Sequence, residues 1–187
     1  WFDSLSRDMI MNGELDRLVL EDGLRGITSN PTIFHQAVSS SDLYDDTILQ
    51  GVRSDKTTEE IFDDIAREDI QATCDVLRHV YDTSDRADGF VSLEENPHIA
   101  SDTYASVQEG FRLSALIDRP NLLIKIPATP EGILASGNLL KNGVNVNITL
   151  MFSLVHYDAV ANAYITALEE RLRLGRPLDT VASVASM

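Results

Sequence analysis

Short apolar runs alternate along the chain with longer stretches in which apolar positions recur at helical spacing. The short runs predict strands, and the longer stretches predict helices. The predicted strands are residues 1–3, 24–29, 89–94, 122–127, 144–149 and, less clearly marked, 180–186. The predicted helices are residues 59–81, 101–117, 130–140 and 154–174. Strands that alternate with helices in this way indicate a parallel α/β fold, either a barrel or a doubly wound sheet.

The longest helical pattern covers residues 59–81. Its apolar stripe consists of Ile61, Ile65, Ile70, Val76, Leu77 and Val80. Cys74 lies in the same stretch, and we interpret it as a core residue. Because it is the single cysteine, it cannot form an internal disulfide, and a reducing cytoplasm is the expected compartment.

One strand contains a lysine in an otherwise apolar run. Residues 122–127 read Leu-Leu-Ile-Lys-Ile-Pro, which is apolar enough for a strand buried on both faces. Lys125 must then keep an unpaired ammonium out of water or exist partly as the neutral amine. A neutral amine can attack a carbonyl and form a Schiff base. The alternative is a strand-end lysine whose stem reaches out to water, and this segment alone leaves both interpretations open.

Polar side chains gather on one face near the carboxyl ends of several predicted strands. Alternation along each strand assigns to such faces Ser92 and Glu94, then Lys125, and then Asn145, Asn147 and Thr149. A polar face could simply be the wet side of an antiparallel sheet. The intervening helices argue instead for parallel strands, and in a (β/α)₈ barrel the active site is assembled at this end.

Two further polar residues lie near predicted strands. Asn30 precedes Pro31, which favours an extended backbone at the end of a strand. It could cap the helix that follows or bind a ligand, and spacing alone does not decide between these roles. Asp3 precedes Ser4 and could likewise be only a helix cap. The four histidines have no shared spacing suited to a metal site, and no phosphate-binding loop or dinucleotide fingerprint is present in the sequence.

Composition narrows the expected partners. The formal net charge of −15 argues against nucleic acid and against an anionic membrane surface. No apolar run approaches the roughly 18–20 residues that a membrane-spanning helix needs. A length of 187 residues is most simply one domain with a substantial core.

Several separated motifs closely resemble the signatures of the transaldolase family. The longest are residues 26–34 (GITSNPTIF), 122–133 (LLIKIPATPEGI) and 143–153 (GVNVNITLMFS). Residues 1–7 and 90–94 also match in order and spacing. The resemblance is specific, because the motifs agree over nearly the whole chain. It implies a (β/α)₈ TIM-barrel enzyme of the cytoplasm that transfers a dihydroxyacetone unit from sedoheptulose 7-phosphate to glyceraldehyde 3-phosphate.

The resemblance also assigns catalytic roles. Lys125 matches the Schiff-base lysine, and Asp3 matches the acid/base group that deprotonates the C4 hydroxyl so that the C3–C4 bond breaks. Glu94 matches the carboxylate that, with Thr149, positions the water used in carbinolamine dehydration. The iminium is itself an electron sink, so we expect neither a metal nor an organic cofactor.

Only some of the substrate-binding residues of the family have a match in this sequence. Asn30 and Asn147 match residues that hydrogen-bond the dihydroxyacetone moiety. In the family, the motif that begins at Ser183 continues into a strand whose serine and arginine bind substrate phosphate, and Met187 precedes that strand. A barrel of this kind needs about 250 residues, so we expect residues 1–187 to hold about six βα units of a barrel domain incomplete at its C-terminus. We expect such a chain, standing alone, to be inactive.

Two other functions compete with transaldolase. A related fructose 6-phosphate aldolase would release free dihydroxyacetone. Such lyases typically carry glutamine at the position of Glu94 and a tyrosine on a strand beyond this sequence, so Glu94 favours transaldolase. The second competitor is a non-catalytic barrel fragment that binds or regulates, against which the joint presence of the matched residues argues.

Overall fold

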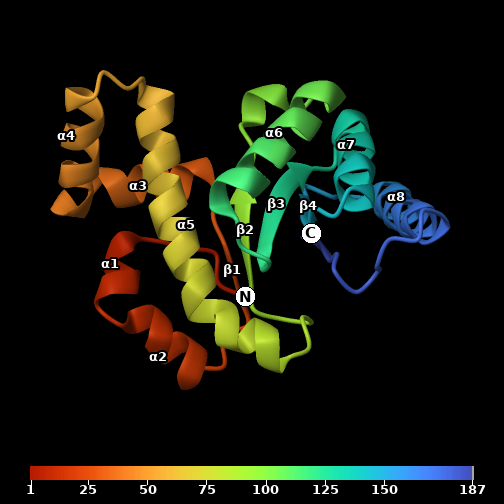
Figure 1. Cartoon of the computed structure of the whole chain (residues 1–187), viewed down its shortest axis with the longest axis horizontal. Coiled ribbons are helices and arrows are strands. Elements are labelled where there is room, and N and C mark those ends of the chain that lie inside the picture. The colour runs from red at the N-terminus through yellow and green to blue at the C-terminus, as the bar shows by residue number, and fades with distance from the viewer. Residues whose placement is uncertain (187) are drawn as a thin grey trace. The chain divides into compact units, whose positions relative to one another are not determined.

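The computed structural model describes residues 1–186, which form two compact units (Figure 1). The first unit comprises Trp1–Val91 and Ile117–Asn121. It contains α1 (Arg7–Met11), α2 (Glu14–Leu20), β1 (Gly26–Thr28), α3 (Pro31–Ser39), the 3₁₀ helix η1 (Asp42–Tyr44), α4 (Asp45–Arg53), α5 (Thr58–Thr83) and the start of β2 (Phe90–Glu94).

The second unit comprises Ser92–Leu116 and the described chain from Leu122 onward. It contains the end of β2, the 3₁₀ helix η2 (Pro97–Ile99), α6 (Thr103–Ile117) up to Leu116, β3 (Leu122–Pro127), α7 (Pro130–Lys141), β4 (Val146–Thr149), α8 (Leu154–Arg173) and β5 (Ser183–Ala185).

The strands follow one another in the sheet in the order of the sequence, β1-β2-β3-β4-β5. β3 pairs in parallel with β4, and β4 pairs in parallel with β5. A doubly wound sheet would reverse its strand order at a switch point, whereas a barrel keeps the sequential order. The predicted parallel α/β fold is confirmed, and the strand order favours the barrel over the doubly wound sheet.

Near the N-terminus the sequence prediction is only partly met. Residues 1–3 form an isolated bridge between Phe2 and Ile27 in place of a full strand. Helices α1, α2 and α4 were not predicted, and α3 was considered only as the helix that Asn30 could cap. All four are short, so each offers too few apolar positions for a recognisable stripe, and side-chain caps help to define α1 and α3. At α1, for example, the Ser6 hydroxyl accepts a hydrogen bond from the Met9 amide at 3.3 Å.

In the first unit, α5 supplies much of the core. Ile65, Ile70, Leu77 and Val80 of the predicted stripe are buried. Thr57 and Glu60 form a capping box at the start of the helix, which fixes where it begins. Cys74 is fully buried in this core, as predicted, and burial raises the pKa of its thiol well above the usual range. A thiol in that state stays protonated and unreactive.

In the second unit, β3 is buried on both faces, as the sequence predicted. Leu123, Ile124 and Ile126 have no measurable exposure, and neither have Val146 and Ile148 of β4. Leu139 and Leu140 of α7 are equally buried. A strand covered in this way leaves few routes to solvent, so its polar side chain has to find a partner within the protein.

Candidate active site

Lys125 and Glu94 form an ion pair at the carboxyl ends of β3 and β2. The Lys125 Nζ lies 3.1 Å from the Glu94 Oε2, and the two side chains are 12% and 20% exposed. Of the states that the strand alone left open for Lys125, the unpaired ammonium is not the one found, because Glu94 supplies the counter-charge that a buried ammonium needs. The predicted parity of the two strands, by contrast, brings these side chains together as expected.

Asn147 is fixed beside this pair by two hydrogen bonds. The β3–β4 register places it opposite Lys125, and its side chain is fully buried. Its Nδ2 donates to the Ser92 hydroxyl at 3.0 Å, and its Oδ1 accepts from the Ser186 hydroxyl at 2.8 Å. Both ends of the amide are thus held, which defines the direction in which each end points.

Ser186 was not predicted as part of this group. It follows β5, and its amide donates to the Ile148 carbonyl at 2.8 Å, which aligns it with the end of β4. The available signal was a small hydroxyl residue at the carboxyl end of a predicted strand. That signal is common, and it gains meaning only when β5 is known to pair with β4.

Thr149 ends β4 and lies opposite Pro127 in the register. It is almost completely buried, and its carbonyl accepts from the Ala128 amide at 2.7 Å. The second unit therefore brings Glu94, Lys125, Asn147 and Thr149 to the carboxyl ends of neighbouring parallel strands. The role of Thr149 in positioning water stays a prediction.

Asp3 and Asn30 belong to the first unit. The Thr28 hydroxyl of β1 donates to the exposed Asp3 Oδ1 at 3.0 Å. Asp3 is not the N-cap of α1, since Ser6 has that role. Asn30 does act as a cap, because its Oδ1 accepts from the Ile33 amide at 3.0 Å. The capping interpretation of Asn30 is confirmed, and its binding of substrate stays a prediction.

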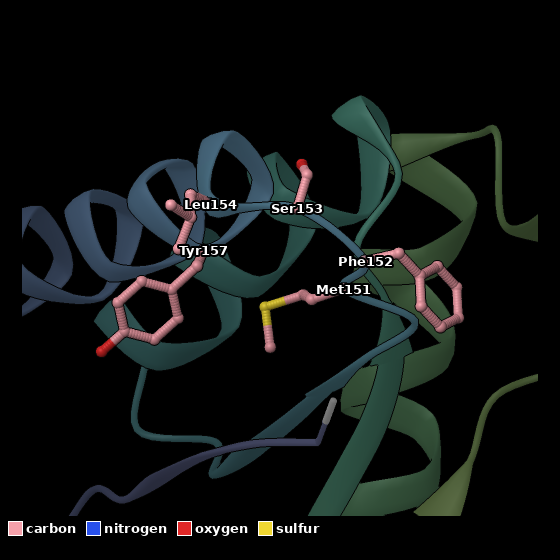
Figure 2. Close-up of a pocket in the computed structure, with 5 residues that line it drawn as sticks. All are labelled: Met151, Phe152, Ser153, Leu154 and Tyr157. Carbon is pink, nitrogen blue, oxygen red and sulfur yellow. The ribbon is translucent and has the colours of Figure 1, made fainter.

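An open hollow of about 590 Å³ lies beside the loop that joins β4 to α8 and beside the first turn of α8. It is lined by Met151, Phe152, Ser153, Leu154 and Tyr157 (Figure 2). Figure 2 shows Met151 between the Phe152 and Tyr157 rings, which point away from each other. The lining is mainly apolar, and none of the predicted catalytic residues belongs to it. We therefore assign no chemistry to this hollow.

Residues 1–186 offer neither a metal-binding cluster nor a membrane-spanning helix. They contain no group of three or more histidine, cysteine, aspartate or glutamate side chains suited to hold a metal ion. Across the same residues, no helix is both long and apolar enough to cross a membrane.

Comparison with known proteins identifies the family. The family model described as Transaldolase/Fructose-6-phosphate aldolase matches residues 1–187. A transaldolase of Trichodesmium erythraeum is 43% identical over 186 residues, which are 100% of this chain and 49% of that protein. Transaldolase 2 of a Nostoc species is 45% identical over the same length, with 49% of it covered. A transaldolase of Thiobacillus denitrificans is 42% identical over 187 residues, with 52% covered.

The chain thus spans about half the length of the curated relatives it matches. Its sequential α/β fold agrees with part of a barrel, and its ion-paired lysine lies at the carboxyl end of a strand, as the motifs predicted. Because the family model covers the whole chain, this protein belongs to the transaldolase/fructose-6-phosphate aldolase family.

Proposed function

We propose that the full-length protein is a transaldolase that transfers a dihydroxyacetone unit from sedoheptulose 7-phosphate to glyceraldehyde 3-phosphate. The observation that carries the proposal is the Lys125 amine at the end of β3, 3.1 Å from the Glu94 carboxylate, in a chain whose relatives are named transaldolases. An amine in a largely dry site, next to a carboxylate that can exchange protons with it, is suited to Schiff-base chemistry.

The first stage of the proposed reaction is formation of the iminium. The Lys125 Nζ attacks the ketone carbon of the donor sugar and forms a carbinolamine. Loss of water then gives the iminium, and this step needs a group that delivers a proton to the departing hydroxyl. Glu94 is within contact distance of the Nζ, so we assign it the proton transfer, with Thr149 helping to position the water.

The second stage is carbon–carbon bond cleavage. Asp3 takes the proton of the C4 hydroxyl, the C3–C4 bond breaks, and its electron pair moves into the iminium to give an enamine. Erythrose 4-phosphate leaves as the aldehyde product. The enamine then attacks the carbonyl carbon of glyceraldehyde 3-phosphate, Asp3 returns its proton, and hydrolysis releases fructose 6-phosphate and the free Lys125 amine.

Asn30 and Asn147 are the proposed binding residues for the dihydroxyacetone unit. The cap on α3 uses the Asn30 Oδ1, so its amide nitrogen is the end suited to donate to a substrate hydroxyl. Asn147 uses one N–H toward Ser92 and one lone pair of its oxygen toward Ser186. Its amide has a second N–H and a second lone pair, so a substrate hydroxyl can bond it while both serine contacts remain.

The same proposal includes the partners, the compartment and the pathway of the protein. The partners are sugar phosphates, the compartment is the cytoplasm, and the reaction belongs to the pentose phosphate pathway. No cofactor is required, since the iminium itself accepts the electrons. The strongly acidic net charge of −15 supports neither nucleic acid nor an anionic membrane as a partner.

Release of free dihydroxyacetone, as in a fructose 6-phosphate aldolase, is the second candidate function. The family model spans both activities. Glu94 favours transfer, because the lyases of this family typically carry glutamine there. The two reactions share the enamine intermediate. In transfer it attacks the acceptor aldehyde, whereas in cleavage it takes up a proton and is hydrolysed to free dihydroxyacetone.

Borohydride trapping tests the proposal directly. We expect the full-length protein, treated with fructose 6-phosphate and borohydride, to acquire a stable adduct that peptide mapping assigns to Lys125. Absence of an adduct would eliminate both enzymatic functions and favour the non-catalytic alternative. If the adduct forms, a second assay supplies sedoheptulose 7-phosphate as the donor and measures erythrose 4-phosphate with and without glyceraldehyde 3-phosphate. Sustained turnover needs this acceptor in the transferase and does not need it in the lyase.

Replacing Glu94 by glutamine should slow Schiff-base formation without preventing it. Glutamine keeps the size of the side chain but cannot exchange a proton with the Lys125 amine. General acid–base groups typically contribute about 10²–10⁴-fold, so we expect the rate of adduct formation to fall within that range. Adding borohydride at successive times after mixing with fructose 6-phosphate, and measuring the adduct by intact mass, gives that rate. A variant that traps substrate as fast as the parent protein would contradict the role of Glu94.

A further inference from the structure

Glu95 is a buried carboxyl that the proposed reaction does not use. It directly follows Glu94 and is only 1% exposed. Its Oε1 contacts the hydroxyl of Ser106, on α6, at 3.1 Å, and Ser106 is itself fully buried. The other oxygen, Oε2, has no hydrogen-bond partner within residues 1–186. A carboxylate left half-paired in a dry interior would be costly, so the charge state of Glu95 needs an explanation.

The hydrogen bonds around Ser106 accommodate a neutral acid. The Ser106 Oγ lies 3.1 Å from Glu95 Oε1 and 3.3 Å from the Ile99 carbonyl, but a hydroxyl has a single proton to donate. If Glu95 is protonated on Oε1, it donates to Ser106, and Ser106 donates to Ile99. If Glu95 is ionised, Ser106 can donate to only one of these two oxygens.

The neighbouring charges favour the same state. The pKa of Glu95 is raised to about 7, mainly by burial and to a smaller degree by the nearby carboxylates of Glu109 and Glu94, while the Ser106 hydrogen bond opposes the rise. Glu109 lies on α6, and Glu94 is the last residue of β2, directly before Glu95. The cation on β3, Lys125, is already paired with Glu94.

Glu95 is also attached to the strand that carries the lysine. Its backbone amide donates to the Lys125 carbonyl at 3.2 Å. Its side chain reaches α6 through Ser106, and η2 through the Ile99 carbonyl. The residue after Glu94 is therefore fixed at its backbone and at its side chain, and both attachments limit how Glu94 can move relative to Lys125.

From these contacts we propose that Glu95 is a positioning residue for the Glu94–Lys125 pair and that it acts as the neutral carboxylic acid. The inference rests on the proposed Schiff-base role of Lys125. Ionisation of Glu95 would disturb the link to α6 and add a second negative charge beside the pair. That charge repels the Glu94 carboxylate, which moves the group that exchanges protons with Lys125 out of its position.

The test compares the pH dependence of borohydride trapping in the full-length protein with that of two variants. With fructose 6-phosphate as the probe, the rate of adduct formation in the parent protein should fall, relative to Glu95→Gln, as the pH rises above 7. Above the pKa of Glu95, the fraction of its neutral form falls about tenfold per pH unit, so the rate cannot fall more steeply than that. Glutamine keeps a donor toward Ser106 and cannot ionise. In that variant the rate of adduct formation should therefore lack the decrease above pH 7, which we call the falling limb of the pH profile.

Glu109→Gln is the matched second variant. It removes one of the charges that favour the neutral form of Glu95 without altering the buried contacts. The falling limb should therefore move to lower pH in this variant, a shift that a purely structural role of Glu95 does not predict. An identical limb in the parent protein and Glu95→Gln would overturn the proposal, and so would a limb that stays in place in Glu109→Gln.

A stability measurement separates this inference from the proposed function. The folded pKa of Glu95 is above that of an unfolded glutamate, so the denaturation midpoint of the parent protein should fall as the pH rises from about 5 through 7. Glu95→Gln should lose this component of the fall. If no Lys125 adduct forms at any pH, the proposed function fails. If the midpoint follows Glu95 but adduct formation does not, the positioning role alone fails.

Discussion

Replacing Lys125 by methionine in the full-length protein should eliminate the borohydride-trapped adduct and reduce transaldolase turnover by at least about 10⁴-fold. Removal of a catalytic nucleophile costs up to about 10⁶-fold in other enzymes, and methionine has no amine to attack the ketone. It does fill a similar volume in the buried strand. The adduct is measured by intact mass, and turnover is measured by acceptor-dependent formation of erythrose 4-phosphate.

The matched control for this variant is Lys141→Met. Lys141 lies at the end of α7, partly exposed, and pairs with Glu170. It lies outside the group at the strand ends, so its replacement should leave both the adduct and turnover close to the parent values. Substantial turnover in Lys125→Met, or an adduct that maps to another lysine, would contradict the assignment of the nucleophile.

The second large effect is expected from Arg7, whose guanidinium joins α1 to α5. Its Nε lies 2.8 Å from the Asp69 Oδ1, and its other nitrogens contact Glu68 at 2.9 Å and Thr47 at 3.2 Å. The guanidinium also lies over the Tyr44 ring, 4.6 Å from its centroid. Asp69 is almost completely buried, and burial raises its pKa while Arg7 opposes that rise.

Arg7→Met should lower the free energy of unfolding by about 3–5 kcal/mol, the usual cost of breaking a buried ion pair from one side. The loss arises mainly because Asp69 keeps its buried position without a counter-charge. Denaturant unfolding of the full-length protein at pH 7 measures the change. Combining Arg7→Met with Asp69→Asn should recover part of it, since the uncompensated charge is then removed.

An exposed ion pair provides the control for Arg7. Arg17 and Asp22 lie 2.7 Å apart, and both side chains are about half exposed. Such pairs contribute about 0–1 kcal/mol, so Arg17→Met should cost no more than that. Equal losses from Arg7→Met and Arg17→Met would contradict the view that burial of Asp69 makes the Arg7 pair important.

The second half of the chain was the more predictable part of the fold. Strands β3 and β4 and helices α7 and α8 lie close to the predicted positions, because each is long enough or apolar enough to show its period. Helices α1, α2 and α4 escaped prediction because they are short, and α3 was foreseen only as the helix that Asn30 could cap. Caps such as Ser6 and Asn30 are weak signals, because their meaning depends on the backbone that follows them.

The candidate site also has a part that the sequence predicted and a part that it did not. Alternation along the strands was enough to group Glu94, Lys125, Asn147 and Thr149 at one end of the sheet. The partners of these residues were not predictable, because hydrogen bonds and ion pairs depend on which strands are neighbours. The contact of Lys125 with Glu94 and that of Asn147 with Ser186 both cross between strands.

By itself, the sequence determined the kind of fold, the family to which its motifs are similar and the chemistry that Lys125 could perform. These are properties of residue type, period and order, which are local. Tertiary structure decided that the lysine is paired and that Asn147 is held at both ends. It also decided that Glu95 is buried, with one oxygen that has no hydrogen-bond partner among the residues that the structure describes. Each of these depends on distances between residues far apart in the sequence, and packing alone sets those distances.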